Sequence, residues 1–371
     1  MISKKKILYI VNVDWFFTSH RLPIATEALK KGYEIHLLTK FTEEEDNLKK
    51  LGIVTHHLKI DRGSISFLGQ FVNLINIINK LIKIKPDLVH LVTIKPVLLG
   101  GMACKLLNIK ATVASISGLG YIFSNKSLKT KFIKRIVILL YKLIYENSNN
   151  IKFIFQNDQD KKLIKNVINL KNSQIKLIPG SGIDLDKFKI AAIPRGAPII
   201  LFASRLLKSK GILDFISASK FVEGSRFVVV GKYDFDNRDS ISEEIIKKHV
   251  ENGSIEYWGF KKNMREIIEM STIVVLPSYY GEGLPKILVE AAACGRPIVT
   301  TDHPGCRDAI ESNKTGLLVP IKSPFFIGKA INTILKDPEL IRKMSLNSRK
   351  LAEEKFNIET VIKTHLNIYK E

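Results

Sequence analysis

The sequence predicts an α/β protein made of two Rossmann-like domains in tandem, each built on a mainly parallel sheet. Short strand-like runs rich in Val, Ile and Leu alternate with longer helix-like stretches in both halves of the chain, which is the pattern of βαβ units. A segment with Gly and Pro, 179–198, separates the two halves. A chain of 371 residues that is 45% hydrophobic can bury two ordinary cores. We therefore expect one domain over residues 1–180 and a second that begins at residue 181.

The expected strands follow this alternation in order. In the first half they are 6–11, 35–39, 88–93, 112–117 and 153–156. In the second half they are 199–203, 226–230, 255–258, 273–277 and 297–300. Ligands of open parallel sheets bind at the carboxyl ends of the strands. Arg205, Gly231, Gly259 and Glu282 each follow an expected strand, so we take them as candidates for a ligand site.

Cysteine content indicates a protein of a reducing compartment, and the lengths of the apolar runs indicate neither a signal peptide nor a membrane span. The three cysteines, Cys104, Cys294 and Cys306, form no CxxC pair and predict neither a disulfide framework nor a zinc site. The apolar run 7–11 is too short for the core of a signal peptide and is expected to be the first strand. No apolar stretch reaches the roughly 18 residues that span a bilayer. We expect a cytoplasmic protein that does not cross the membrane.

Positive charge is concentrated in the first half of the chain. Residues 1–180 hold 29 Lys and Arg against 12 Asp and Glu, whereas residues 181–371 hold 29 against 24. Codon bias explains part of the excess, but it should affect both halves equally. The asymmetry favours an anionic partner for the first half, either a phospholipid headgroup layer or a lipid diphosphate. Nucleic acid is not expected, because the sequence has no nucleic-acid module and no basic patch interleaved with aromatic residues.

The segment 127–146 indicates where a membrane contact could lie. It has the pattern of a helix in which basic residues stand beside many apolar ones. Such a helix can lie in a lipid interface, and it can equally be an ordinary domain helix with one buried face. Both interpretations stay open at the level of sequence.

The segment 281–300, GEGLPKILVEAAACGRPIVT, combines a glycine-bearing turn, a helix and a strand. It places Glu282 and Glu290 eight residues apart, one before the expected helix 284–293 and one about two turns along it. The preceding strand and loop place the helix N-terminus at the carboxyl edge of the sheet. The unpaired N–H groups and the dipole of that terminus favour an anionic group such as a diphosphate.

Here the sequence resembles the retaining glycosyltransferases of family 4, which have the GT-B fold and a Glu-x7-Glu motif. Three further segments carry the resemblance: FASRLLKSKGILDFI with Arg205 and Lys210, PGSGIDLDKF over 179–188, and GCRDAIESNKTGLLVP over 305–320. The resemblance implies two Rossmann-like domains that face each other across a cleft. It also implies a donor domain over 181–352 and a C-terminal helix over 353–371 that returns to the first domain.

By this resemblance, the second domain binds a nucleotide-sugar donor. Arg205 and Lys210 would hold the donor diphosphate, since a guanidinium gives two aligned N–H bonds to phosphate oxygens and an ammonium adds a point charge. Glu282 would contact the transferred sugar, and Glu290 would accept from the ribose hydroxyls. The further donor-binding candidates are Gly231, Gly259, Phe260, Gly283, Leu284 and Pro285. Arg205, Lys210 and both glutamates could also be ordinary solvated or helix-end charges.

The first domain would supply the acceptor side. The segment 14–25, DWFFTSHRLPIA, resembles the loop after the first strand of transferases that extend lipid-linked glycans, although it lacks the glycine pair that many relatives carry there. The acceptor-side candidates are Ser19, His20, Lys95, Gly118 and Tyr121. His20 is the histidine we consider as a catalytic candidate, and a structural or capping role is its alternative.

Two Asp-x-Asp patterns, Asp184 with Asp186 and Asp234 with Asp236, resemble the metal-binding pair of the other glycosyltransferase fold. The first belongs to the segment between the domains, and the second to a polar turn. Because Arg205, Lys210 and a helix N-terminus can neutralise the diphosphate, we expect neither a metal nor another cofactor.

The sequence therefore predicts a retaining glycosyltransferase that moves an N-acetylhexosamine, such as GalNAc, from a UDP-sugar to a polyprenyl-diphosphate-linked or other surface-glycan acceptor. We expect it at the inner face of the cytoplasmic membrane, in peripheral contact with anionic lipid. GDP-mannose and plain UDP-hexoses remain open as donors. The alternatives are a UDP-sugar 2-epimerase or hydrolase of the same fold, and a non-catalytic sugar-nucleotide-binding protein.

Overall fold

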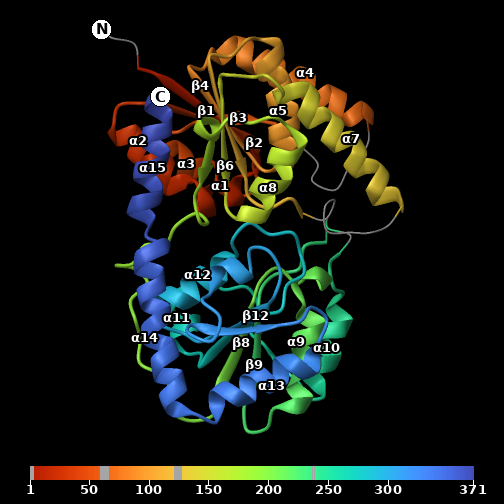
Figure 1. Cartoon of the computed structure of the whole chain (residues 1–371), viewed down its shortest axis with the longest axis vertical. Coiled ribbons are helices and arrows are strands. Elements are labelled where there is room, and N and C mark those ends of the chain that lie inside the picture. The colour runs from red at the N-terminus through yellow and green to blue at the C-terminus, as the bar shows by residue number, and fades with distance from the viewer. Residues whose placement is uncertain (1–3, 59–66, 121–127, 236, 238) are drawn as a thin grey trace. The chain divides into compact units, whose positions relative to one another are not determined.

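The computed structural model describes the chain except for residues 1–3, 59–66, 121–127, 236 and 238. It divides into two compact units (Figure 1). The first consists of Met1–Ser181 with Thr360–Glu371, and the second of Gly182–Glu359. The sequence places the corresponding boundaries at 180 and 352.

The first unit is built on a seven-stranded sheet with the order β3-β2-β1-β4-β5-β6-β7, in which all neighbours are parallel. The strands are β1 Lys6–Val13, β2 Glu34–Lys40, β3 Val54–His57, β4 Leu88–Val92, β5 Ala111–Ile116, β6 Ile151–Phe155 and β7 Ile175–Leu177. Each of the five strands predicted for this half overlaps one of them. The prediction missed β3 and β7, which are short edge strands without a buried apolar run.

Helices cover both faces of this sheet, because successive side chains of a buried strand point to opposite sides. Ile7 and Tyr9 of β1 pack on one side with helices α1 Asp14–His20, α2 Leu22–Lys30, α3 Glu45–Lys50 and the C-terminal α15 Ile358–Lys370. Leu8 and Ile10 pack on the other side with α4 Phe67–Ile84, α5 Ile94–Leu106, α7 Leu128–Tyr145 and α8 Asp158–Val167. The segment 14–25, which we expected as a loop, forms α1 and the start of α2 instead.

The second unit repeats the design on a six-stranded parallel sheet with the order β10-β9-β8-β11-β12-β13. Its strands are β8 Ile199–Ala203, β9 Arg226–Val230, β10 Glu256–Tyr257, β11 Ile273–Leu276, β12 Ile298–Thr301 and β13 Gly316–Val319. Its helices are α9 Ile212–Ala218, α10 Glu243–Glu251, α11 Met264–Glu269, α12 Lys286–Ala293, α13 Pro324–Leu335 and α14 Pro338–Lys355. All five predicted strands are present, and β13 was missed. The prediction of two parallel, Rossmann-like domains is confirmed.

Helix α12 begins at Lys286, two residues later than predicted. Pro285 precedes it as the N-cap with extended backbone, and the N–H groups of Leu288 and Val289 bond to its carbonyl. Proline is tolerated there because helix-start N–H groups have no partner within the helix. The turn 281–285 therefore stays outside the helix and in front of its N-terminus.

The chain passes between the units twice, at residues 181–182 and 359–360. Next to these passages, Ile183 bonds through its N–H to the carbonyl of Phe356 at 2.7 Å, and Ile358 bonds to the carbonyl of Ile183 at 3.0 Å. Both connecting segments are thus joined to each other by backbone hydrogen bonds. Among the described residues, no helix is long and apolar enough to cross a bilayer.

Candidate active site

The candidate donor residues gather at the carboxyl edge of the second sheet. Strands β9, β8 and β11 are neighbours there, and β8 and β11 flank the point at which the strand order reverses. Arg205 follows β8, and Lys210 ends the short 3₁₀ helix Lys208–Lys210 before α9. Glu282 lies in the turn between β11 and α12. The connection after β8 and the turn after β11, which are distant in sequence, thus meet at one edge.

Lys210 and Glu282 form an ion pair. Their side chains are only 12% and 11% exposed, so the pair is largely shielded from water. The hydroxyl of Ser278 donates to the other carboxylate oxygen of Glu282 at 2.6 Å. The Lys210 ammonium also lies 5.5 Å from the centre of the Tyr280 ring. Glu282 is therefore held at both oxygens, with a cation beside it.

Arg205 pairs with Asp234 across the neighbouring strands. Its Nη1 donates to the Asp234 carboxylate at 2.6 Å, and both side chains are largely buried. The turn that carries Asp234 leaves β9 at Gly231, where an added Cβ would lie 1.8 Å from the carbonyl oxygen of Ser204. Only glycine allows this close approach, so the two strand ends can lie close enough for the pair to form.

Glu290 lies on α12 and is almost fully buried. Burial raises the pKa of its carboxyl, and the nearby Lys286 opposes this shift from 3.6 Å. A buried carboxyl costs the fold stability, and a residue with a pKa shifted in this way is a candidate for ligand binding. Gly283, Leu284 and Pro285 form the turn that leads into this helix.

The turn in front of α12 packs against a second turn that follows β12. Gly305 has φ +81°, and a Cβ there would lie 2.1 Å from the carbonyl oxygen of Gly283. His303 lies in the same turn, and burial lowers the pKa of its imidazole while the charge of Glu282 raises it. His303 was not among our candidates, because its closeness to Glu282 depends on the pairing of β11 with β12.

The candidates after β10 lie beside the Asp234 turn. Gly259 accepts a hydrogen bond at its carbonyl from Gly231 N–H at 3.0 Å. Phe260 is 57% exposed, and the Lys232 ammonium lies 5.5 Å from its ring centre. An exposed aromatic ring at this edge can stack on a planar group. Phe260 is therefore not a core residue.

The acceptor-side candidates lie at the carboxyl edge of the first sheet. Ser19 and His20 end α1, Lys95 is in the first turn of α5, and Gly118 follows β5. These elements follow β1, β4 and β5, which are adjacent strands. The His20 ring stacks on Phe16 with centroids 4.1 Å apart, and its Nδ1 lies 3.2 Å from the Phe16 carbonyl oxygen. Tyr121 lies outside the described residues.

Arg21 joins two of these acceptor-side segments, and the sequence did not predict this role. Its guanidinium donates to the carbonyl of His20 at 2.9 Å and to the hydroxyl of Ser117 at 3.2 Å. The side chain is 1% exposed. Burial lowers the pKa of the Arg21 guanidinium, while Tyr369 and Tyr9 raise it. Arg21 therefore fixes the end of α1 to the turn after β5.

Asp14 is a second residue that we did not predict. It is buried at the start of α1 and accepts hydrogen bonds from the backbone N–H groups of Thr42, Glu43 and Glu44, and from the Thr42 hydroxyl. Burial raises the pKa of its carboxyl, but these bonds outweigh burial and lower it below the usual range. Asp14 thereby ties the segment after β1 to the segment after β2.

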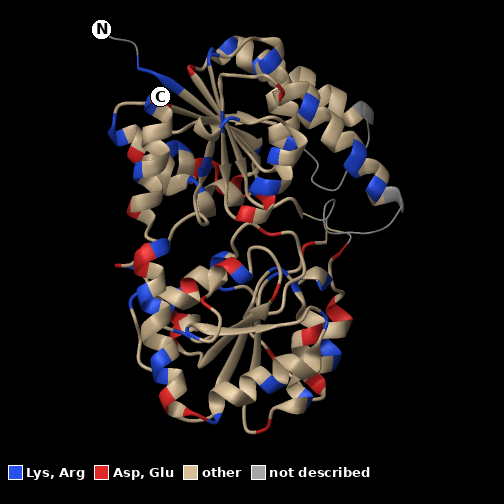
Figure 2. Cartoon of the chain, in the orientation of Figure 1, with Lys and Arg blue, Asp and Glu red and all other residues tan. Residues whose placement is uncertain are grey.

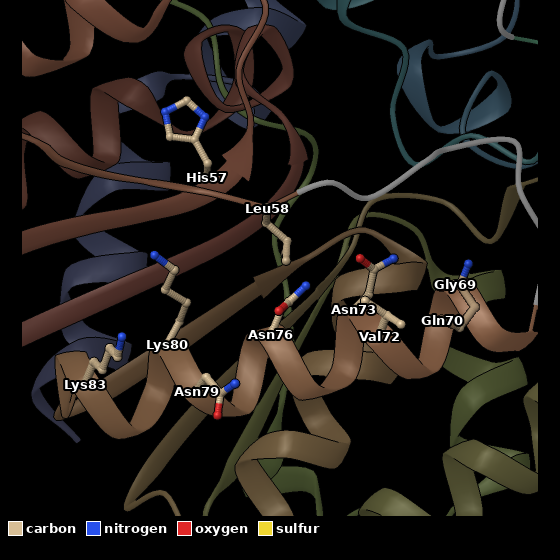
Figure 3. Close-up of a pocket in the computed structure, with 10 residues that line it drawn as sticks. All are labelled: His57, Leu58, Gly69, Gln70, Val72, Asn73, Asn76, Asn79, Lys80 and Lys83. Atoms are coloured by element: carbon tan, nitrogen blue, oxygen red, sulfur yellow. The ribbon is translucent and has the colours of Figure 1, made fainter.

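The first unit also contains a cavity of about 630 Å³ between the end of β3 and α4. Figure 3 shows that polar side chains of α4, among them Asn73, Asn76 and Lys80, lie along it, with His57 on the strand side. None of the predicted site residues lines this cavity. Most of its polar lining comes from α4.

No cluster of three or more His, Cys, Asp or Glu side chains with metal-binding geometry occurs among the described residues. Asp234 of the second Asp-x-Asp pattern pairs with Arg205, and Asp236 lies outside the described part of the chain. Asp184 instead accepts from the backbone N–H groups of Asp186 and Lys187, as a turn residue does.

Known proteins match both units. Residues 6–157 match the family model of glycosyl transferase 4-like domains, and residues 184–351 match that of glycosyl transferases group 1. The chain is 99% covered by sucrose-phosphate synthase from Thermosynechococcus elongatus, with a TM-score of 0.82 at 20% identity. It is also 99% covered by Anabaena HepE in complex with UDP and glucose, with a TM-score of 0.79 at 16% identity. These structures cover the chain over both sheets and have its fold.

The two family matches and the fold define the class: this protein is a glycosyltransferase of the GT-B type. Among curated relatives, it is 27% identical over 364 residues to the N,N'-diacetylbacillosaminyl-diphospho-undecaprenol alpha-1,3-N-acetylgalactosaminyltransferase of Campylobacter jejuni, with 94% of each chain covered. It is 25% identical over 324 residues to the Escherichia coli UDP-Gal:alpha-D-GlcNAc-diphosphoundecaprenol alpha-1,3-galactosyltransferase, with 80% of this chain and 78% of the relative covered.

Proposed function

We propose that this glycosyltransferase retains the anomeric configuration of its donor and transfers an N-acetylhexosamine, with GalNAc preferred, from a UDP-sugar to a polyprenyl-diphosphate-linked glycan. The observation that carries the proposal is the shielded cluster of Lys210, Glu282 and Ser278 beside the Arg205–Asp234 pair. The end-to-end similarity to a transferase named for an undecaprenyl-diphosphate acceptor supports the acceptor class.

The reaction needs charge stabilisation more than proton transfer. The bond between the anomeric carbon and the phosphate oxygen breaks, and its electron pair leaves with UDP. The acceptor hydroxyl oxygen bonds to that carbon from the same face, and its proton passes to the departing phosphate oxygen. Arg205 and Lys210 would stabilise the departing diphosphate, and Glu282 would stabilise the positive charge that develops on the sugar.

The pairing of the cations with carboxylates has a consequence for binding. Arg205 with Asp234 and Lys210 with Glu282 sum to no net charge. A diphosphate that enters must take at least one cation from its carboxylate. When the donor takes Lys210, the Glu282 carboxylate is released to accept from a sugar hydroxyl, so one exchange prepares both groups for the reaction. The positive end of the α12 dipole would add to the attraction.

Glu290 would accept from the ribose hydroxyls, and the exposed ring of Phe260 would lie near the base. With two cations and a helix N-terminus available, the proposed reaction proceeds without a metal ion. In the first unit, Ser19, His20, Lys95 and Gly118 would contact the acceptor, together with Tyr121. The protein would work at the inner face of the cytoplasmic membrane, where a lipid-linked acceptor is accessible.

The test is a turnover panel of UDP-GalNAc, UDP-GlcNAc, UDP-galactose, UDP-glucose and GDP-mannose, with and without a short polyprenyl-diphosphate sugar. Acceptor-dependent nucleotide release with one donor is expected, with activity retained in EDTA. Glu282→Gln and Arg205→Ala should reduce it by about 10²-fold or more, as loss of a transition-state contact does. Arg226→Ala is the matched control, because Arg226 forms an exposed pair with Glu256 on the same sheet.

The remaining outcomes separate the alternatives. Equal release without acceptor would identify a hydrolase or a 2-epimerase, and the epimerase would yield a sugar changed at one carbon. Thermal stabilisation by donors without turnover by any donor and acceptor pair would favour a binding protein. Proton coupling constants of the product distinguish retention from inversion at the anomeric carbon.

A further inference from the structure

Helices α4, α5 and α7 form one continuous helical layer in the first unit. Helix α5 packs against α4 on one side and α7 on the other (Figure 1). Their inner side chains join a single buried cluster with the sheet, to which Ile77, Val97 and Val137 contribute one residue from each helix. Their remaining side chains face away from the sheet. We call this outer surface the α4–α5–α7 face.

This face exposes large apolar side chains. Eight of the eleven exposed large apolar residues described in the first unit lie on it: Phe71, Val72, Ile75, Ile82, Leu106, Phe132, Leu139 and Leu143. On α4, residues 71, 75 and 82 follow one helical stripe, and on α7, residues 132, 139 and 143 do the same. Phe132 is 63% exposed and Phe71 is 61% exposed. A surface on which exposed apolar side chains are concentrated is typical of an interaction site.

The same three helices carry only positive charge. Residues 67–84, 94–106 and 128–145 hold nine Lys and Arg and no Asp or Glu. The helices on the opposite face of the sheet, 14–20, 22–30, 45–50 and 358–370, hold five Lys and five acidic residues. Figure 2 shows blue without red along α7. These three helices therefore contribute nine of the 29 basic residues of the first half and none of its 12 acidic residues.

The amino-acid composition of these helices indicates which kind of partner the face binds. Eight of the nine basic residues of these three helices are Lys, which is depleted from protein–protein interfaces, whereas Arg is enriched there. Lysine beside exposed Phe, Leu and Ile is the pattern of helices that lie in a lipid interface, with apolar side chains below the headgroups and ammonium groups among the phosphates. The binding of such a helix strengthens with the apolar area that it buries and with its electrostatic attraction to anionic lipid.

We propose that the α4–α5–α7 face docks on an anionic phospholipid surface, with α4 and α7 lying along the membrane. The proposal deepens the membrane contact included in the proposed function, and it needs neither donor nor acceptor to be tested. It also gives the basic first half of the chain a defined contact area.

The experiment is sedimentation of the full chain with vesicles of phosphatidylglycerol and phosphatidylcholine, or of phosphatidylcholine alone, at low and high salt. Wild-type protein should bind the anionic vesicles and lose binding as salt rises. Lys131→Glu with Arg135→Glu should weaken binding by at least about tenfold. Phe132→Ser with Leu139→Ser should weaken it at both salt concentrations. The matched control is Lys31→Glu with Lys363→Glu, which makes the same charge change at exposed sites on the opposite helical layer and should bind as wild type does.

Equal binding by the face variants and the control, or no binding of the wild type to anionic vesicles, would overturn the proposal. A dimer that is lost in the face variants, without vesicle binding, would also overturn it and identify a second copy as the occupant. The Lys131→Glu, Arg135→Glu variant should keep full transfer to a short-chain acceptor in solution. If the wild type binds vesicles but transfers no sugar, the proposed function fails and the docking surface stands.

Discussion

The hydroxyl of Tyr369 lies 2.8 Å from the hydroxyl of Tyr9, although 360 residues separate them in the chain. Tyr369 is at the end of α15, and Tyr9 is in the middle of β1. His90 extends the contact, with Nδ1 2.7 Å from Tyr369 Oη and Nε2 2.7 Å from Ser115 Oγ. These groups are fully buried, where hydrogen bonds are strong and unpaired groups are costly. The C-terminal helix is therefore attached to the centre of the first sheet by polar contacts as well as apolar ones.

Tyr369→Phe should destabilise the first unit by about 1–3 kcal/mol, because it leaves buried polar atoms of Tyr9 and His90 without a partner. Urea unfolding measures the loss. The control is Tyr33→Phe, at a half-buried tyrosine of the same unit. If the two variants unfold at the same urea concentration, the buried network contributes nothing beyond packing.

The first unit should lose stability in acid because of its buried histidines. Burial lowers the pKa of His365 to about 3 and holds that of His90 well below its ordinary value. The unfolded chain therefore binds more protons than the folded one below about pH 6.5. Stability falls as the pH drops from there toward 3, by up to about 1.4 kcal/mol per pH unit for His365, and His90 acts in the same direction. Urea midpoints measured between pH 7 and 4 test this slope.

His365→Leu should reduce the acid slope by the contribution of one histidine. It also removes a buried Nε2 that has no hydrogen-bond partner among the described residues. His57→Gln is the control, since His57 is 68% exposed. An unchanged slope in His365→Leu would place the acid sensitivity elsewhere.

Glu290→Gln should stabilise the second unit at pH 7.5 while it weakens donor binding. Burial raises the pKa of Glu290, so the folded state disfavours the carboxylate at a pH above the ordinary glutamate value, and a neutral amide avoids this cost. A gain of about 1 kcal/mol corresponds to a rise in Tm of roughly 2–4 °C for a unit of this size. Melting curves and the KM for the donor, measured together, test both effects. A fall in Tm would mean that the carboxylate is well paired in the fold.

Lys210→Met and Glu282→Gln, singly and combined, should separate the structural part of the ion pair from its catalytic part. Each single change leaves a shielded charge without its partner and should cost about 1–3 kcal/mol of stability, whereas the double change should cost less than their sum. Activity should not recover in the double variant, since the proposed reaction needs both groups. Activity restored in the double variant would show that the pair only supports the fold.

Gly305→Ala should impair the donor site more than the backbone strain alone explains. Both Gly305 and Gly253 have positive φ, but a Cβ at Gly253 meets nothing within 4 Å, whereas one at Gly305 meets the Gly283 carbonyl oxygen at 2.1 Å. Gly253→Ala should therefore show only the cost of a Cβ in the left-handed conformation, about 1–2 kcal/mol. Gly305→Ala should unfold earlier and raise the donor KM, because it displaces the turn next to Glu282. Equal stability and KM in the two variants would contradict this.

The sequence predicted the elements whose patterns are local. Buried strands such as Ile199–Ala203 and Arg226–Val230 appear at the predicted positions, because a continuous apolar run bounded by turn residues is typical of a parallel strand. The edge strands Val54–His57 and Ile175–Leu177 lack that run. Arg205, Lys210 and Glu282 could be chosen as candidates because each follows such a strand. Their roles in the reaction stay predictions.

By itself, the sequence determined the two-domain parallel architecture, the position of the helix that follows Glu282 and the excess of positive charge in the first half. Periodicity, turn residues and composition are properties of neighbouring residues, so they can be read along the chain. Only the tertiary structure decided which partners meet: Ser278 and Lys210 at Glu282, Asp234 at Arg205, and Tyr369 at Tyr9. It also decided that three helices with nine basic and no acidic residues are adjacent in one layer. Strand order brings distant segments to the same sheet edge or face, and that order depends on packing throughout the domain.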